Sequence, residues 1–265
     1  MVSDFFEELV SNLRKSDFFG ICAKSAYYLL LAVFPFLIFL INFINMLPLG
    51  QDAVSIYLMR LFPDAIAQII DDNMGIISAK PSGGLMSVGV LVGVYVASRA
   101  IASILKGLDF SKGDNVRGFF KNAFISVFLT IGFVVVISGY FALSILSNRF
   151  LSVVAKNAFV EALWLVAEMI FYFFTIFLSA FLLYYFASDR QAGFMQIFPG
   201  AIFCALFLII SSKVFSFYAT QLKDYSLVYG TLSGAAATLA WLYLIAMGMV
   251  LGGEVCIAFF RIGKK

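Results

Sequence analysis

Four charged side chains, Arg99, Glu168, Lys213 and Glu254, lie inside or at the edge of long apolar stretches of the sequence. A charge buried in hydrocarbon costs at least about 2.5–3.5 kcal/mol, so it normally faces an opposite charge or a water-filled cavity. The chemistry open to these residues is therefore ion pairing or the binding of a charged group. In one interpretation they line a route for an amphiphilic or ionic substrate and exchange partners as the protein opens. In the other, Arg99 and Glu254 form a static clamp, while Lys213 and Glu168 reach towards the membrane surface.

Other kinds of site lack their usual residues. The sequence contains no histidine, and its three cysteines, Cys22, Cys204 and Cys256, are far apart and lie in or beside apolar runs. Zinc, haem and a Cys–His nucleophile would lack their usual ligands and bases, so we expect no metal or other cofactor. The sequence also has no phosphate-binding loop for ATP hydrolysis. We predict that the chain is not an enzyme, because Glu168 and Glu254, the acids available for chemistry on a lipid, are expected at opposite depths.

The composition is that of a membrane protein. Of 265 residues, 63% are hydrophobic and 12% are charged, whereas an ordinary soluble domain has about 25% charged residues. Residues 225–253 form a run of 29 positions without a charged side chain. At a rise of about 1.5 Å per residue, a helix of this length exceeds a hydrocarbon core of roughly 30 Å. The chain leaves no room for a large soluble domain, so we expect a single domain over residues 1–265.

The same apolar pattern recurs along the chain and predicts an all-α polytopic membrane protein with six transmembrane helices. The expected spans are residues 25–47, 85–106, 122–146, 162–187, 194–219 and 230–259. Residues 1–20 are predicted to form a cytoplasmic amphipathic segment, and residues 48–84, which are too polar to span, short interfacial helices on the outer face. Pro35 and Pro199 are expected to bend the first and fifth helices, because proline removes a backbone hydrogen bond.

The distribution of lysine and arginine predicts the orientation. These residues are more frequent on the side that holds both termini, which the positive-inside rule assigns to the cytoplasm. The most basic loop, residues 106–121, lies on that side and carries Lys106, Lys112, Arg117 and Lys121. We expect these side chains to contact the anionic head groups of membrane lipids, and a specific phosphate site is the alternative. Nucleic-acid binding is not expected, because the basic residues are few and lack interleaved aromatic residues on a soluble face.

The predicted topology pairs the four buried charges by depth. The second and sixth helices both run inwards, which places Arg99 and Glu254 in the cytoplasmic half of the membrane as a possible ion pair. The fourth helix runs inwards and the fifth outwards, so Glu168 and Lys213 are expected together in the outer half. Each pairing joins an acid with a base from a separate helix.

Several short motifs occur in a distinctive order. They are Ala26-Tyr27-Tyr28-Leu29 followed by Phe34-Pro35-Phe36, then Ser98-Arg99, Phe198-Pro199-Gly200-Ala201, Tyr229-Gly230, Trp241-Leu242-Tyr243 and Leu251-Gly252-Gly253-Glu254. Together they resemble the YihY/BrkB family of bacterial inner-membrane proteins over nearly the whole chain. The resemblance implies a six-helix protein of the bacterial inner membrane and makes Arg99 and Glu254 motif residues. Members of that family were once labelled ribonuclease BN, and some are associated with serum resistance or proposed to move lipids or other envelope solutes.

The leading functional hypothesis is transport. We expect an inner-membrane protein that translocates or exports a lipid, or an amphiphilic or anionic envelope solute, through a polar cavity between the helices. Arg99 and Glu254 would form an inner gate or a head-group site, and the partners would be membrane lipids and this substrate rather than nucleic acid. A non-transporting scaffold of the envelope is the alternative, and a membrane-embedded lipid-modifying enzyme is a third hypothesis. The ribonuclease label finds no support in a sequence without histidine and without a soluble domain.

Overall fold

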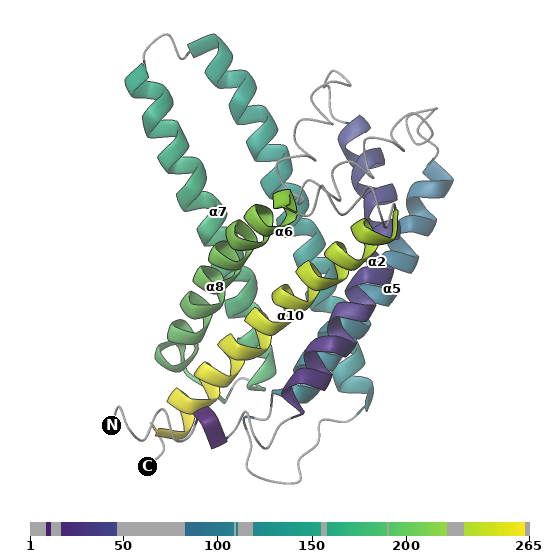
Figure 1. Cartoon of the computed structure of the whole chain (residues 1–265), viewed down its shortest axis with the longest axis vertical. Coiled ribbons are helices and arrows are strands. Elements are labelled where there is room, and N and C mark those ends of the chain that lie inside the picture. The colour runs from purple at the N-terminus through teal and green to yellow at the C-terminus, as the bar shows by residue number, and fades with distance from the viewer. Residues whose placement is uncertain are drawn as a thin grey trace.

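Six long helices account for nearly all of the described chain (Figure 1). The computed structural model describes residues 9–11, 17–46, 83–108, 110, 119–154, 158–189, 191–221 and 231–262. The helices are α2 (Phe18–Met46), α5 (Gly83–Gly107), α6 (Phe119–Val154), α7 (Ala158–Ala187), α8 (Phe194–Gln221) and α10 (Thr231–Ile262). Within these described ranges there is no β-strand.

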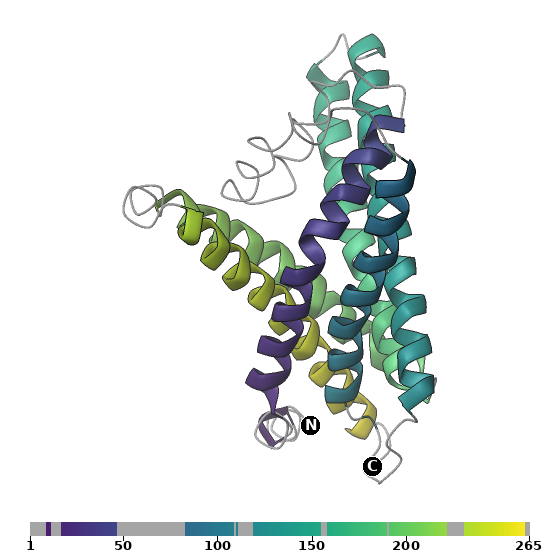
Figure 2. The same ribbon diagram turned by 90° about the vertical axis from the view of Figure 1, so that its right-hand side faces the viewer.

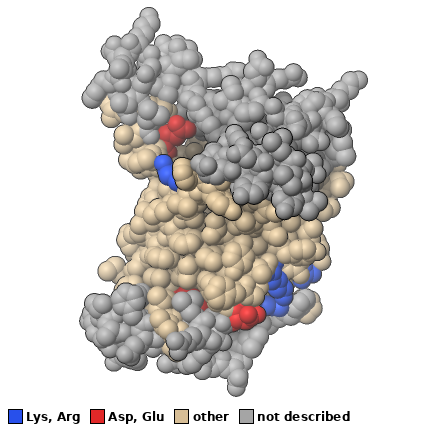
Figure 3. Space-filling model, viewed as in Figure 1, with Lys and Arg blue, Asp and Glu red and all other residues tan. Residues whose placement is uncertain are grey.

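The helices are apolar along most of their length and on their outer surfaces. α5, α6, α7, α8 and α10 each contain a segment long and apolar enough to cross a membrane, and α2 contributes the shorter apolar segment Phe18–Val33. Large apolar side chains such as Phe120, Phe124 and Met195 are strongly exposed. Figure 3 shows a broad band without charged side chains across the middle of the face in view. Exposed apolar surface on this scale is typical of helices surrounded by lipid. The predicted all-α polytopic membrane fold is confirmed.

The predicted span boundaries agree with the helices to within a few residues, apart from two differences. The first helix begins at Phe18 rather than at residue 25, because the apolar pattern continues back to that point and the amide of Ile21 donates to the carbonyl of Asp17 at 2.9 Å. The third helix runs on to Val154 rather than ending at residue 146. Residues 9–11 are helical, whereas the predicted interfacial helices lie outside the described residues apart from the start of α5.

The two ends of the bundle are arranged differently. At one end of the bundle, α2, α6 and α8 begin and α5, α7 and α10 finish (Figure 1). We call this the closed end. There the rings of Phe110 and Phe260 pack edge to face, with centroids 5.9 Å apart. The opposite end, where α8 finishes and α10 begins, is the open end. Figure 2 shows α8 and α10 leaning away from the other four helices towards the open end. The orientation of the termini relative to the membrane stays a prediction.

The buried core follows this division. The main cluster draws on all six helices, and its members on α8 and α10 lie in the halves of those helices nearer the closed end, up to Leu208 and from Ala246 onwards. Nearer the open end, a separate small cluster of described residues joins these two helices: Phe215 and Ala237 are buried, and Trp241 and Leu244 pack against them. α8 and α10 therefore form a pair that shares the common core at the closed end and keeps its own contacts towards the open end.

Candidate functional site

The glycine motifs of α8 and α10 lie where these two helices cross closely. A Cβ atom added to Gly252 would lie 2.8 Å from the Cβ of Cys204 and 2.8 Å from the carbonyl oxygen of Gly200, closer than packed atoms approach. A side chain at position 252 would therefore push the helices apart. Small residues allow such close approach between membrane helices, where packing rather than the hydrophobic effect drives association.

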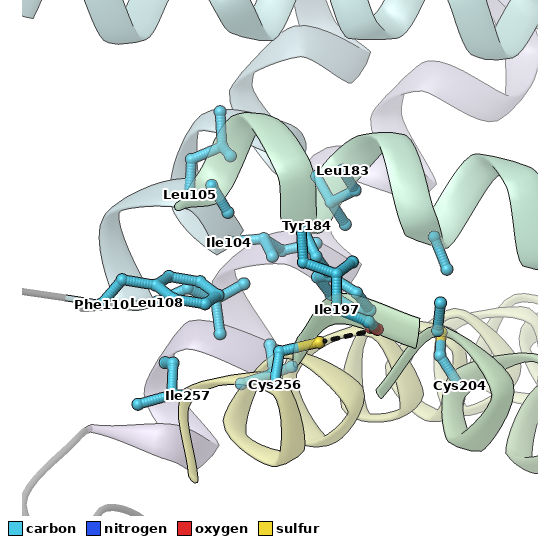
Figure 4. Close-up of a cluster of buried hydrophobic side chains, with 14 of the residues drawn as sticks. Ile104, Leu105, Leu108, Phe110, Leu183, Tyr184, Ile197, Cys204, Cys256 and Ile257 are labelled. Carbon is cyan, nitrogen blue, oxygen red and sulfur yellow. Dashed lines mark hydrogen bonds between the residues drawn. The ribbon is translucent and has the colours of Figure 1, made fainter. Parts of the chain in front are cut away.

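Side-chain hydrogen bonds add α7 to this crossing. The hydroxyl of Tyr184 on α7 donates to the backbone carbonyl of Met249 on α10 at 2.7 Å. The thiol of Cys256 on α10 donates to the carbonyl of Ile197 on α8 at 3.3 Å, which Figure 4 shows as a dashed line. We call the group formed by Tyr184, Gly200, Gly252 and Cys256 the closed-end joint. It holds three helices together through backbone contacts that other side chains would not reproduce.

Glu254 is buried next to the closed-end joint, with 2% of its surface exposed. The neighbouring Gly253 packs against the side chain of Leu108, which directly follows α5. Glu254 is therefore level with the end of α5. Arg99 lies nine residues before Leu108 in the sequence, a distance of about 13 Å along a helix axis.

Arg99 has a different environment. Its Nη2 atom donates to the hydroxyl of Tyr95, one turn earlier on α5, at 2.9 Å, and its Cζ atom lies 5.1 Å from the centroid of the same ring. This contact directs the guanidinium towards the open end, away from Glu254. Within the part of the chain that the structure describes, Arg99 and Glu254 are not brought together. The expected match in depth between Arg99 and Glu254 was wrong because α10 crosses the bundle obliquely. Equal numbers of residues along α5 and α10 therefore do not correspond to equal heights in the bundle. The role of Arg99 and Glu254 as a gate stays a prediction.

The other predicted charges lie at separate places. Glu168 is half-buried on α7 and Lys213 is exposed on α8, and their contact stays a prediction. Lys106 and Lys121 are exposed at the closed end, as lipid head-group contacts require. Lys121 also forms an ion pair with Asp189 at 2.6 Å, which links the start of α6 to the turn between α7 and α8. Lys112 and Arg117 lie outside the described residues.

A cavity of about 270 Å³ lies between α2, α5, α6 and α10. Its wall includes Phe36 of α2, Val94 of α5, Val134 of α6, and Trp241 and Met249 of α10. Among the described lining residues, Thr130 and Trp241 carry a polar side-chain group, and the hydroxyl of Thr130 already donates to the carbonyl of Ser126 at 2.7 Å. None of the four charged residues that were expected to line a polar cavity is in its wall, so this apolar cavity is not the predicted one. Arg99 points to the opposite side of α5.

The prolines take part in this architecture. Pro35 and Pro199 both lie inside continuous helices, α2 and α8. A Cβ atom added to Gly93 of α5 would lie 3.2 Å from the Cβ of Pro35, so the proline packs directly on the glycine face of α5. The bends expected at the two prolines stay predictions.

Comparison with known proteins identifies the family. A family model described as virulence factor BrkB matches residues 9–261. The chain belongs to the BrkB family. It is 29% identical to the putative ribonuclease-like protein YfkH of Bacillus subtilis, over 95% of this chain and 93% of that protein. A UPF0761 membrane protein of Vibrio parahaemolyticus is 27% identical over 96% of this chain and 81% of its own length. No solved structure matches the chain.

The family match covers all six helices of this BrkB-family protein and the closed-end joint. Its membrane-protein relatives and its apolar helices make it a multi-pass protein of the bacterial inner membrane. The structure explains two of the motifs by which the sequence resembles the family: Gly200 and Gly252 allow the backbones of α8 and α10 to meet. In the Ser98-Arg99 motif, the arginine has no such packing role.

Sequence reasoning missed the apolar cavity and the hydrogen bonds of the closed-end joint. The cavity residues are ordinary apolar side chains, and nothing in their type separates them from side chains that face lipid. One signal was available, because Gly89 and Gly93 both line the cavity on α5. Their spacing predicts a close helix contact but not the space beside it.

Proposed function

We propose that this BrkB-family protein moves a lipid or another amphiphile through the bacterial inner membrane, with the apolar part of that molecule in the cavity between α2, α5, α6 and α10. The observation that carries the proposal is the cavity itself, with about 270 Å³ of space and an apolar lining. Hydrocarbon suits such a space, whereas an ion or a polar solute would lose its hydration without gaining hydrogen bonds.

The different packing of α8 and α10 at the two ends of the bundle supports a mechanism by which the cavity changes its shape. Trp241 and Met249 form part of the cavity wall, and Trp241 also packs in the separate cluster that joins α8 to α10. In our proposal, α8 and α10 move as a pair about the closed-end joint, and the cavity wall on α10 moves with them. Sliding or hinging of packed helix pairs is a common form of conformational change.

Transfer of a labelled lipid between bilayer leaflets tests the proposal. Purified protein is reconstituted in vesicles of phosphatidylethanolamine and phosphatidylglycerol that contain a phospholipid with a fluorescent acyl chain. Dithionite bleaches the label in the outer leaflet, and any further loss reports transfer from the inner leaflet. We expect faster transfer than in protein-free vesicles. Val134→Phe should slow lipid transfer by about tenfold, because the larger side chain would overpack the cavity when an acyl chain occupies it, at a cost of about 1–3 kcal/mol.

The matched control lies on the next residue of the same helix. Val135 is 64% exposed and lies outside the cavity wall, so Val135→Phe should transfer lipid at close to the wild-type rate. Equal slowing by both substitutions would show that the cavity is not the route. Folded wild-type protein that gives no transfer above protein-free vesicles would contradict the transport proposal and favour the scaffold.

A further inference from the structure

Arg99 and Tyr95 belong to an exposed face of α5 that points away from the cavity. Residues 88, 92, 95 and 99 follow each other at helical spacing, so their side chains share one face. Val88 is 59% exposed, Val92 46% and Tyr95 58%. On the opposite face of α5, glycines and small residues pack against α2 and line the cavity. The guanidinium is therefore at the outer surface of the bundle, among side chains that face lipid.

This cation also lies well within the transmembrane segment. The segment of α5 that is long and apolar enough to span a membrane is Ser87–Gly107, so Arg99 is about 12 Å from its end at the closed side and about 18 Å from its other end. Arginine at this depth is costly without an anion, and local thinning of the bilayer and entry of water reduce the cost by bringing polar groups to it.

The arginine is held in place but keeps most of its capacity to donate hydrogen bonds. A guanidinium has five N–H donors, and within the described residues the hydrogen-bond acceptor that the structure gives Arg99 is the hydroxyl of Tyr95. Because that hydroxyl accepts a hydrogen bond from Arg99, its own proton is directed elsewhere and can reach a second acceptor.

We propose that Arg99 and Tyr95 form a binding site for the phosphate of an anionic phospholipid on the outer face of α5. Charge complementarity supports this occupant: a guanidinium binds two phosphate oxygens with parallel hydrogen bonds, and the tyrosine hydroxyl supplies one more donor. The anionic phospholipids of a bilayer carry such a phosphate. A second copy of the chain would have to bring a carboxylate to the same place. The exposed residues that share this face with Arg99 are Val88, Val92, the neutral Tyr95 and, two turns nearer the closed end, a second cation, Lys106, and none of them is acidic. The site lies on the other side of α5 from the cavity, so it does not depend on transport.

Native mass spectrometry of lipid retention tests the site. The purified protein is incubated with equal amounts of phosphatidylglycerol and phosphatidylcholine with identical acyl chains, and bound lipids are resolved by mass. The wild type should retain phosphatidylglycerol in preference to phosphatidylcholine. Arg99→Gln should reduce this retention by about tenfold, because it removes charged hydrogen bonds. Arg99→Lys keeps the charge but loses the planar donor pair, and Tyr95→Phe loses the hydroxyl, so both should have intermediate retention.

Lys213→Gln is the matched control, since it removes another exposed basic residue from a membrane-spanning segment, Phe194–Tyr218. Its retention should equal that of the wild type. Circular dichroism and gel filtration check folding, and if Arg99→Gln does not fold, the milder Arg99→Lys and Tyr95→Phe variants carry the comparison. Retention unchanged by all Arg99 and Tyr95 substitutions would overturn the site. Displacement of the lipid by inorganic phosphate, or a dimer that disappears with Arg99→Lys, would overturn phospholipid as its occupant.

Discussion

The closed and open ends of the bundle hold their helices together in different ways. At the closed end, glycine, cysteine and tyrosine bring the backbones of α7, α8 and α10 together through close contacts and two hydrogen bonds. Towards the open end, α8 and α10 lean away from the other helices (Figure 2) and hold each other through a small separate cluster. An apolar cavity lies beside the middle of α10. In a membrane, where all surfaces are apolar, shape and hydrogen bonds rather than hydrophobicity distinguish a fixed contact from a movable one.

The largest loss of stability is expected from the addition of a single methyl group at the closed-end joint. Gly252→Ala places a Cβ against Cys204 and the backbone of Gly200, so the free energy of unfolding should fall by about 1–3 kcal/mol. The control is Gly139→Ala in α6, whose added Cβ meets no atom within 4 Å. It should leave stability unchanged or raise it by up to about 1 kcal/mol, because alanine favours helix. Unfolding in detergent with increasing dodecyl sulfate, followed by circular dichroism, measures both. Equal stability of the two variants would show that the crossing tolerates separation.

A smaller effect is expected from Tyr184→Phe. The substitution removes the hydrogen bond to the carbonyl of Met249 and keeps the ring, so it should destabilise the protein by about 0.5–1.5 kcal/mol. Tyr185→Phe, at the adjacent half-buried position, should change stability much less. The same unfolding measurement applies. If Tyr185→Phe proves as harmful as Tyr184→Phe, the bond between α7 and α10 contributes nothing specific to the joint.

The smallest loss of stability is expected from breaking the ion pair at the surface of the closed end. Lys121 and Asp189 are 54% and 40% exposed, so Lys121→Ala should cost at most about 1 kcal/mol, and less at high salt. Lys24→Ala, at another exposed lysine, serves as the control. Unfolding compared at low and high ionic strength checks the prediction. A salt-independent loss of several kcal/mol would mean that this pair, rather than the buried joint, holds the α7–α8 turn.

The sequence predicted the helices better than the site, for physical reasons. Long uncharged runs must form helices in lipid, so the six helices follow from hydropathy. The pairing of Arg99 with Glu254 failed because depth was counted along the chain, whereas helix tilt and rotation decide which side chains meet. The cavity could not be predicted, since its apolar wall has the same composition as the lipid-facing surface.

The central claim is that the closed end is fixed while the open end changes its width. Pulsed electron paramagnetic resonance tests it with two pairs of spin labels between α6 and α10. Leu143→Cys with Leu239→Cys reports on the half of these helices nearer the open end, and Phe120→Cys with Phe259→Cys on the closed end, all at exposed positions. The three native cysteines are buried and should escape labelling. In vesicles, the closed-end pair should give one narrow distance distribution and the open-end pair a broad or multiple one. Two equally narrow distributions, or a broad one at the closed end, would contradict the account.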